Sequence, residues 1–122
     1  MNLKEFYEKI GGDYEEVLSR LSSDQRIQKY VIRFLDVPDF EALKEAIAAK
    51  DWEKSFLAAH TLKGNALNLG FGNFMRSDAE LTEYLRPRTV ESEQVLMDLF
   101  NKASVDYQNL IDAINELKKS VL

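Results

Sequence analysis

The chain has 122 residues, 45% hydrophobic and 30% charged, a composition typical of one soluble domain with a single core. It contains no cysteine and one histidine, which excludes disulfides, thiolate zinc sites and metal sites built from several imidazoles. The formal net charge of -5 argues against nucleic acid or an anionic membrane as the main partner.

Hydrophobic residues recur at helical spacing along nearly the whole chain, and no stretch alternates as a half-buried strand does. The N-terminal part predicts two short helices, 3–10 and 14–21. A pair of glycines separates them, and Asp13 is the expected cap of the second. A third helix is predicted to begin after Ser22, whose side chain would form a capping box with Gln25.

The middle of the chain predicts three more helices. Pro38 ends the third helix, and Asp39 opens a fourth. Asp51 is the expected cap of a long helix, 52–69, because a helical pattern of apolar residues follows it. After a glycine-containing break, another helix is predicted from about 73 to 85, where an Arg-Pro step ends it.

The last predicted helix, 92–119, carries an apolar stripe with alternating steps of three and four residues: Leu96, Leu99, Ala103, Tyr107, Leu110, Ile114 and Leu117. Such a stripe is typical of the seam of a helical bundle. We therefore predict an all-α fold, an antiparallel up-down four-helix bundle with additional short N-terminal helices, because the connections are short. The expected organisation is a single domain over 1–122, with the bundle at about 23–119 and the short helices at 3–21.

Sequence signals for catalysis are missing. The chain has no Gly-x-Ser-x-Gly nucleophile elbow and no glycine-rich phosphate loop after a strand. Its acidic pairs are expected to be solvated helix faces; they include Glu15, Glu16, Glu80 and Glu83. A phosphoryl group on this chain would therefore have to come from another protein.

The single histidine lies in the long helix 52–69. At about 100° per residue, the expected core face of this helix consists of Trp52, Ser55, Ala59, Leu62, Ala66 and Leu69. His60 falls about 120° from the centre of that face, on its flank or outside it. An exposed imidazole is therefore favoured over one buried and satisfied within the core.

The residues that follow His60 favour a functional role. Lys63 and Gly64 lie one helical turn further along, on the same side of the helix. Glycine inside a helix costs about 1 kcal/mol relative to alanine, yet its missing side chain would leave the imidazole open to another macromolecule. Lys63 places a positive charge within reach of any anionic group on the ring. This combination suits a histidine that accepts a phosphoryl group transiently.

Three apolar residues are expected around the same face: Phe56, Leu57 and Leu67. Apolar side chains that surround a charged centre indicate a docking patch for a partner. The alternative for Phe56 and Leu67 is a place at the periphery of the core, and the pattern alone leaves both possibilities open.

The motif His60-x-Leu62-Lys63-Gly64, followed by Gly70-Phe71, resembles the histidine-containing phosphotransfer (HPt) domain family of phosphorelays. The resemblance is best from about 38 to 85, and the last helix fits only generically. It implies a four-helix bundle with an exposed histidine midway along one helix. It also implies reversible phosphoryl exchange with an aspartate of a receiver domain.

The resemblance also assigns roles to individual positions. His60 would be the phosphoacceptor through its outer ring nitrogen, Lys63 would stabilise phosphoryl charge, and Gly64 would provide clearance. Many members place Gln or Glu 22 residues after the histidine to orient its ring, and here that position is Thr82. Asn65 replaces the small residue usual after the glycine.

The expected partners are response-regulator receiver domains and a hybrid histidine kinase. The receiver would supply the divalent cation, with no cofactor in this chain, so we expect a phosphoryl carrier and not an enzyme. Two alternatives stay open: a module that docks receiver or kinase domains without effective phosphorylation, and a small helical enzyme or unrelated bundle. Charges near the N-terminus argue against a signal peptide. We expect a free-standing cytoplasmic monomer, with no nucleic-acid or membrane partner.

Overall fold

The computed structural model describes residues 1–121, and this part of the chain is helical without strands. Its elements, in chain order, are α1 (Leu3–Lys9), α2 (Tyr14–Leu21), α3 (Asp24–Arg33), the 3-10 turn η1 (Phe34–Asp36), α4 (Asp39–Ala48), α5 (Trp52–Leu69), α6 (Gly72–Leu85) and α7 (Glu93–Val121). The predicted all-α class is confirmed.

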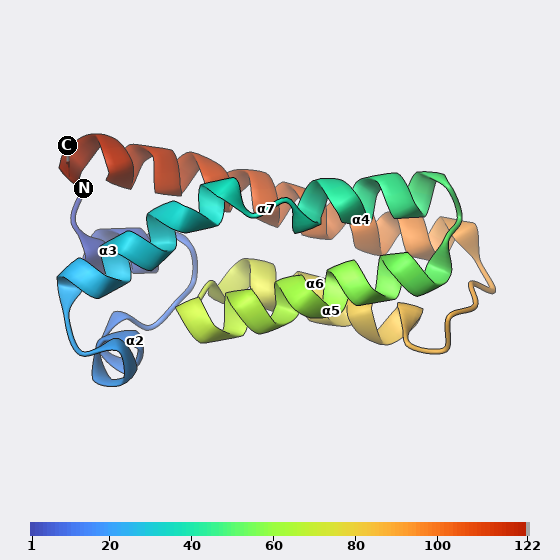
Figure 1. The fold of residues 1–122 in the computed structure, drawn as a ribbon, viewed down its shortest axis with the longest axis horizontal. Helices are drawn as coiled ribbons and strands as arrows, with labels where there is room; N and C mark the ends of the chain where they lie inside the picture. The colour runs from blue at the N-terminus through green and yellow to red at the C-terminus, as the bar shows by residue number, and fades with distance from the viewer. Residues whose placement is uncertain (122) are drawn as a thin grey trace.

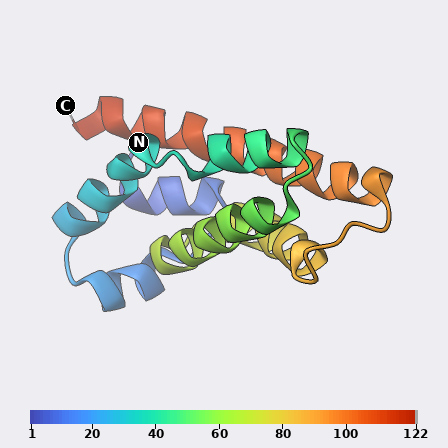
Figure 2. The same cartoon turned by 45° about the vertical axis from the view of Figure 1, so that its right-hand side comes forward.

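The predicted four-helix bundle is also confirmed (Figure 1). Helices α4, α5, α6 and α7 follow one another up and down, and each packs against the next one in the chain. Phe40 of α4 closes the bundle, because its ring stacks on Tyr107 of α7 with the centroids 3.9 Å apart. Helix α3 and η1 extend the line of α4 along α7, as Figures 1 and 2 both show.

The short N-terminal helices cover one end of the bundle. Helix α1 packs against α7, and α2 contacts both α1 and α3. The ammonium of Met1 donates a hydrogen bond to Ser120 Oγ at 2.8 Å, and Lys9 forms an ion pair with Glu116 at 3.0 Å. The two ends of the chain therefore meet at this end of the bundle (Figure 2).

One predicted helix start is wrong by a residue. Ser22 adopts a left-handed conformation (φ 75°) and closes α2, with its backbone N–H donating to the Leu18 carbonyl. Ser23 therefore caps α3, and its side chain accepts a hydrogen bond from the backbone N–H of Arg26. The predicted capping box between Ser22 and Gln25 does not form, because Ser22 already ends the preceding helix.

The end of α3 also differs from the prediction, because the helix stops at Arg33 and not at Pro38, whereas the remaining boundaries lie within two residues of it. Asp13 and Asp51 cap α2 and α5 as expected, since each accepts a hydrogen bond from a backbone N–H of the first turn. The sequence did not predict η1, the tightened turn before Pro38. Asp39 is the first residue of α4, but its helix has no side-chain cap.

The core is one cluster that extends from the four-helix bundle into the N-terminal helices, where Phe6, Val17 and Ile27 are fully buried. On α5 the predicted core face is buried except for Trp52, which is half-buried. On α7 the predicted stripe is buried or half-buried throughout, and Phe100 and Ala113 join it. No helix in residues 1–121 combines the length and the hydropathy that crossing a bilayer requires.

Candidate functional site

Helix α5 holds the candidate site at its middle. Asp51 fixes the start of the helix, and Gly70 ends it in a left-handed conformation (φ 73°). His60 lies between these ends and is exposed to solvent. No hydrogen bond joins its imidazole to another side chain or to the backbone of residues 1–121. The alternative of a histidine satisfied within the core is therefore wrong.

Four exposed residues form one stripe along α5, which we call the α5 stripe: Leu57, His60, Gly64 and Leu67. Steps of three and four residues place them on one side of the helix. Leu57 is 50% exposed and Leu67 is 60% exposed. Leu57 is exposed as predicted, and Leu67, for which the sequence left two possibilities open, is exposed and not part of the core. The docking role of both stays a prediction.

Gly64 differs from the other glycines of the chain. A β-carbon added at Gly64 would have no atom within 4 Å apart from its chain neighbours and the adjacent backbone of its own helix. The same addition would collide with backbone or side-chain atoms at each of the others: Gly11, Gly12, Gly70 and Gly72. Packing inside this chain therefore does not require a glycine at position 64, and the space above it is open.

Lys63 supplies positive charge next to the α5 stripe. Its side chain is half-buried, and no ion pair within residues 1–121 includes it. The ammonium favours the charged forms of Asp78 and Glu83 on α6, since it lowers the pKa of both carboxyl groups. The charge of Lys63 thus acts at the interface of α5 and α6 beside His60.

The prediction that Phe56 belongs to an exposed docking patch is wrong. Its side chain is only 4% exposed. The guanidinium carbon of Arg88 lies 3.8 Å from the centroid of the Phe56 ring, and that of Arg86 lies 5.3 Å from it. Both arginines come from the segment after α6, so they cover Phe56 from a part of the chain that the α5 pattern does not reveal.

Thr82, the predicted orienting residue, faces the interior of the bundle. It is fully buried, and its hydroxyl donates a hydrogen bond to the backbone carbonyl of Asp78 at 2.8 Å. This bond, made one turn back along its own helix, uses the only proton of the hydroxyl. No hydrogen bond joins Thr82 to His60 in the described part of the chain, so the structure gives no support to the orienting role.

Asp78 is a residue that the sequence analysis missed. Its side chain is fully buried, and neither carboxyl oxygen has a hydrogen-bond partner in residues 1–121. Burial raises the pKa of Asp78 to about 8, although the Lys63 ammonium favours the charged form. The carboxyl group is therefore mainly protonated at neutral pH. The available signal was its position between the buried apolar residues Phe74 and Leu81 of α6.

Glu83, next to Thr82, is exposed and already has a partner. Its carboxylate accepts hydrogen bonds from Arg86 at 2.7 and 3.0 Å. Arg86 lowers the pKa of Glu83 most, with smaller contributions from Lys63 and His60. Glu83 thus stays charged near the imidazole but is bound to an arginine, as expected for a solvated acid.

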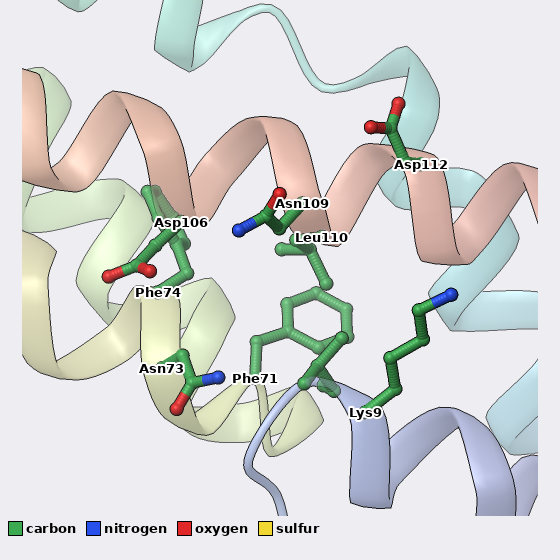
Figure 3. Close-up of a pocket in the computed structure, with 9 residues that line it drawn as sticks. Lys9, Phe71, Asn73, Phe74, Asp106, Asn109, Leu110 and Asp112 are labelled. Atoms are coloured by element: carbon green, nitrogen blue, oxygen red, sulfur yellow. The ribbon is translucent and has the colours of Figure 1, made fainter.

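A cavity of about 390 Å³ lies elsewhere, between α1, the start of α6 and α7 (Figure 3). Phe71 and Leu110 form its apolar part, while Lys9, Asp106 and Asn109 add polar groups. His60 does not line it, so the candidate site lies on the surface of α5, outside this pocket. Residues 1–121 also contain no group of three His, Cys, Asp or Glu side chains placed to hold a metal ion.

The sequence matches the profile of the family described as Hpt domain over residues 37–119, which includes α4, α5, α6 and nearly all of α7. The chain belongs to the Hpt domain family. Hpt domains are phosphocarriers that take part in histidine phosphotransfer in phosphorelays, where they interact with receiver and kinase domains. Comparisons with curated proteins and with solved structures gave no significant match.

The match extends further than the resemblance seen in the sequence. The motif around His60 identified the family from about 38 to 85, whereas the profile also includes most of α7. Within the Hpt fold, His60 is the only histidine of this chain, and it is exposed on α5 beside Lys63 and Gly64.

Proposed function

We propose that this Hpt domain carries a phosphoryl group on His60 and exchanges it reversibly with an aspartate of a response-regulator receiver domain. The observation that carries the proposal is the relation between His60 and Gly64. An exposed imidazole lies one turn from a glycine that the packing of the chain does not need. Glycine lowers the stability of a helix by about 1 kcal/mol relative to alanine. Access for a macromolecular partner is a physical reason for a glycine at this position.

The chemistry requires one lone pair of the ring. Nε2 of the neutral imidazole attacks the phosphorus of the aspartyl phosphate, and a P–N bond forms as the P–O bond to the carboxylate breaks. The aspartate leaves as a carboxylate anion. The ring gains one positive charge, which it loses when the Nδ1 proton passes to solvent. The reverse steps return the phosphoryl group to the receiver.

Lys63 and the α5 stripe would support this exchange. The ammonium of Lys63 has no ion-pair partner in residues 1–121 and is therefore available to phosphoryl oxygens. Leu57 and Leu67 flank His60 as exposed apolar side chains that a receiver would cover. We expect the receiver to contribute the divalent cation and a hybrid histidine kinase to supply the phosphoryl group.

The direct experiment incubates the protein with a phosphorylated receiver domain and follows the label. The proposal predicts transfer to this chain and a phosphoryl group that is stable in alkali and labile in acid. A protein that binds the receiver but gains no label would be the docking module considered as an alternative. A protein that neither binds nor gains a label from any tested receiver or phosphoryl donor would contradict the proposal.

A further inference from the structure

The imidazole of His60 lies against another aromatic ring. Its plane is within 9° of the ring plane of Phe56, and the two centroids are 5.5 Å apart. Phe56 precedes His60 by four residues, so the two side chains are neighbours one helical turn apart. Parallel stacking at this separation is a favourable geometry for aromatic side chains. The ring is therefore oriented by a stacking contact and not by a hydrogen bond.

Phe56 is itself held in place from outside α5. The guanidinium carbon of Arg88 lies 3.8 Å from the centre of its ring, well inside the range of a cation–π interaction. The guanidinium carbon of Arg86 lies 5.3 Å from the same centre. With 4% of its side chain exposed, Phe56 has little room to change its rotamer.

Both the side chain and the backbone of Arg88 are held in place by hydrogen bonds. Its Nε forms an ion pair with Glu53 of α5 at 3.0 Å, and another guanidinium nitrogen donates to the backbone carbonyl of Arg86 at 2.8 Å. Its backbone is left-handed (φ 59°), and its N–H donates to the carbonyl of Leu85 at 2.9 Å. The segment after α6 is thus tied back to α5 directly over Phe56.

We propose that Phe56 is a positioning residue that orients the imidazole of His60, and that Arg88 keeps Phe56 in place. This inference rests on the proposed phosphoacceptor role of His60. Stacking fixes the plane of the ring but leaves both nitrogens free. Nε2 can therefore meet the phosphorus, and Nδ1 can release its proton to solvent.

The consequence depends on the phosphoryl donor. A docked receiver presents its phosphorus from one direction, so a turned imidazole meets it at the wrong angle. Since misplacement of reacting groups by 1 Å can cost about 100-fold in rate, we expect about a tenfold loss when stacking alone is removed. A small donor such as phosphoramidate approaches from any direction, and its reaction should not depend on the stacking.

Three variants separate positioning from packing. Phe56→Leu keeps an apolar side chain but removes the aromatic face, and Phe56→Tyr restores a ring. The matched control is Phe100→Leu on α7. Phe100 is also a buried aromatic residue, but it stacks on Phe40 with 5.8 Å between centroids. Each protein is assayed for its transfer rate at saturating phosphorylated receiver, its half-saturating receiver concentration and its labelling by phosphoramidate.

We expect the loss of stacking to change the saturating transfer rate but not the other two measurements. Phe56→Leu should lower the saturating rate about tenfold, while the half-saturating concentration and the phosphoramidate rate stay within about twofold of wild type. Phe56→Tyr and Phe100→Leu should transfer at close to the wild-type rate. Arg88→Gln, a surface change that leaves Phe56 intact, should give a smaller loss in the same direction.

NMR spectra of the His60 ring protons report on the stacking independently of the transfer assays. Their ring-current shifts should change in Phe56→Leu and be retained in Phe56→Tyr. Identical His60 shifts in wild type and Phe56→Leu would overturn the stacking, and an undiminished saturating rate in Phe56→Leu would overturn the positioning role. A wild-type protein that accepts no phosphoryl group from either donor would instead overturn the proposed function.

Discussion

Thr82 and Asp78 lie one turn apart on α6, and the hydroxyl of Thr82 donates a hydrogen bond to the backbone carbonyl of Asp78 at 2.8 Å. The bond leaves both oxygens of the Asp78 carboxyl without a partner in residues 1–121. Lys63 lies near enough to favour the charged carboxylate, yet burial outweighs it. The bundle therefore contains a neutral acid at the α5–α6 interface beside the candidate site.

This neutral acid makes stability depend on pH. Burial raises the pKa of Asp78 to about 8 in the folded state, above its ordinary value of 3.8. The folded protein thus holds this proton more tightly, and the stability from Asp78 is complete below pH ~4 and is lost as the pH rises toward ~8. Relative to Asp78→Asn, the free energy of unfolding of wild type should fall by up to about 1.4 kcal/mol per pH unit in that range.

Urea unfolding of wild type and Asp78→Asn across this pH range checks the prediction. All other titratable groups are the same in both proteins, including Lys63, whose charge acts on Asp78. Their contributions therefore largely cancel in the difference. Parallel stability curves for the two proteins would show that Asp78 is not a buried neutral acid.

Replacement of Thr82 by valine tests the orienting role directly. Thr82→Val removes the hydroxyl with little change in shape, and the loss of one buried hydrogen bond should cost about 1 kcal/mol or less. Because Thr82 makes no hydrogen bond to His60, the transfer rate from a receiver should stay within about twofold of wild type. A large fall in that rate, with the fold intact, would return the orienting role to Thr82.

Lys63 should matter for transfer and little for folding. Lys63→Ala removes a cation that has no ion-pair partner in the described chain, so its melting temperature should stay within a few degrees of wild type. The transfer rate should fall about tenfold, because the interaction with phosphoryl oxygens strengthens where a docked partner excludes water. Lys63→Arg should recover part of the loss.

The dependence of the transfer rate on ionic strength is the control for this charge effect. Higher ionic strength should slow wild type more than Lys63→Ala, because the alanine variant has already lost the screened interaction. Rapid-quench time courses of transfer from one phosphorylated receiver, at low and high salt, give both comparisons. Equal rates for the two proteins would mean that Lys63 is only a solvated helix residue.

Two substitutions of Gly64 distinguish steric clearance for the receiver from an effect on helix stability. A β-carbon at this position meets no atom beyond its chain neighbours and the adjacent backbone of its own helix, so Gly64→Ala should be neutral or stabilise the protein by up to about 1 kcal/mol. A longer side chain in Gly64→Gln should leave folding intact and raise the half-saturating receiver concentration. Thermal melts and transfer kinetics of both variants test this, and fast transfer with wild-type affinity in Gly64→Gln would remove the steric argument.

Local signals were enough to predict most of the fold. Asp51 caps α5 and Gly70 ends it, and both act on the helix through neighbouring backbone groups. The exposure of His60 followed from the angle between its position and the apolar face. Ser22 was assigned to the wrong helix because Ser22 and Ser23 have the same side chain and could each cap α3. The left-handed backbone of Ser22 ends α2, so Ser23 is the residue that caps α3.

The misses around the site come from contacts between distant parts of the chain. The sequence left Phe56 open between the docking patch and the periphery of the core, because a helical projection gives its direction but not the segment that covers it. That segment contains Arg86 and Arg88, which are about 30 residues further along. Asp78 was missed because an acidic residue is ordinarily exposed, and only its place among the buried residues of α6 marks it.

The role of His60 as the phosphoacceptor is tested by localising the phosphoryl group in wild type and in His60→Gln. Both proteins are incubated with the same phosphorylated receiver, and the modified residue is found by mass spectrometry under alkaline conditions. Because His60 is exposed, His60→Gln should keep the helicity and melting temperature of wild type. We predict a single label on His60 in wild type and none in His60→Gln. Label retained in a folded His60→Gln protein would show that His60 is not the phosphoacceptor.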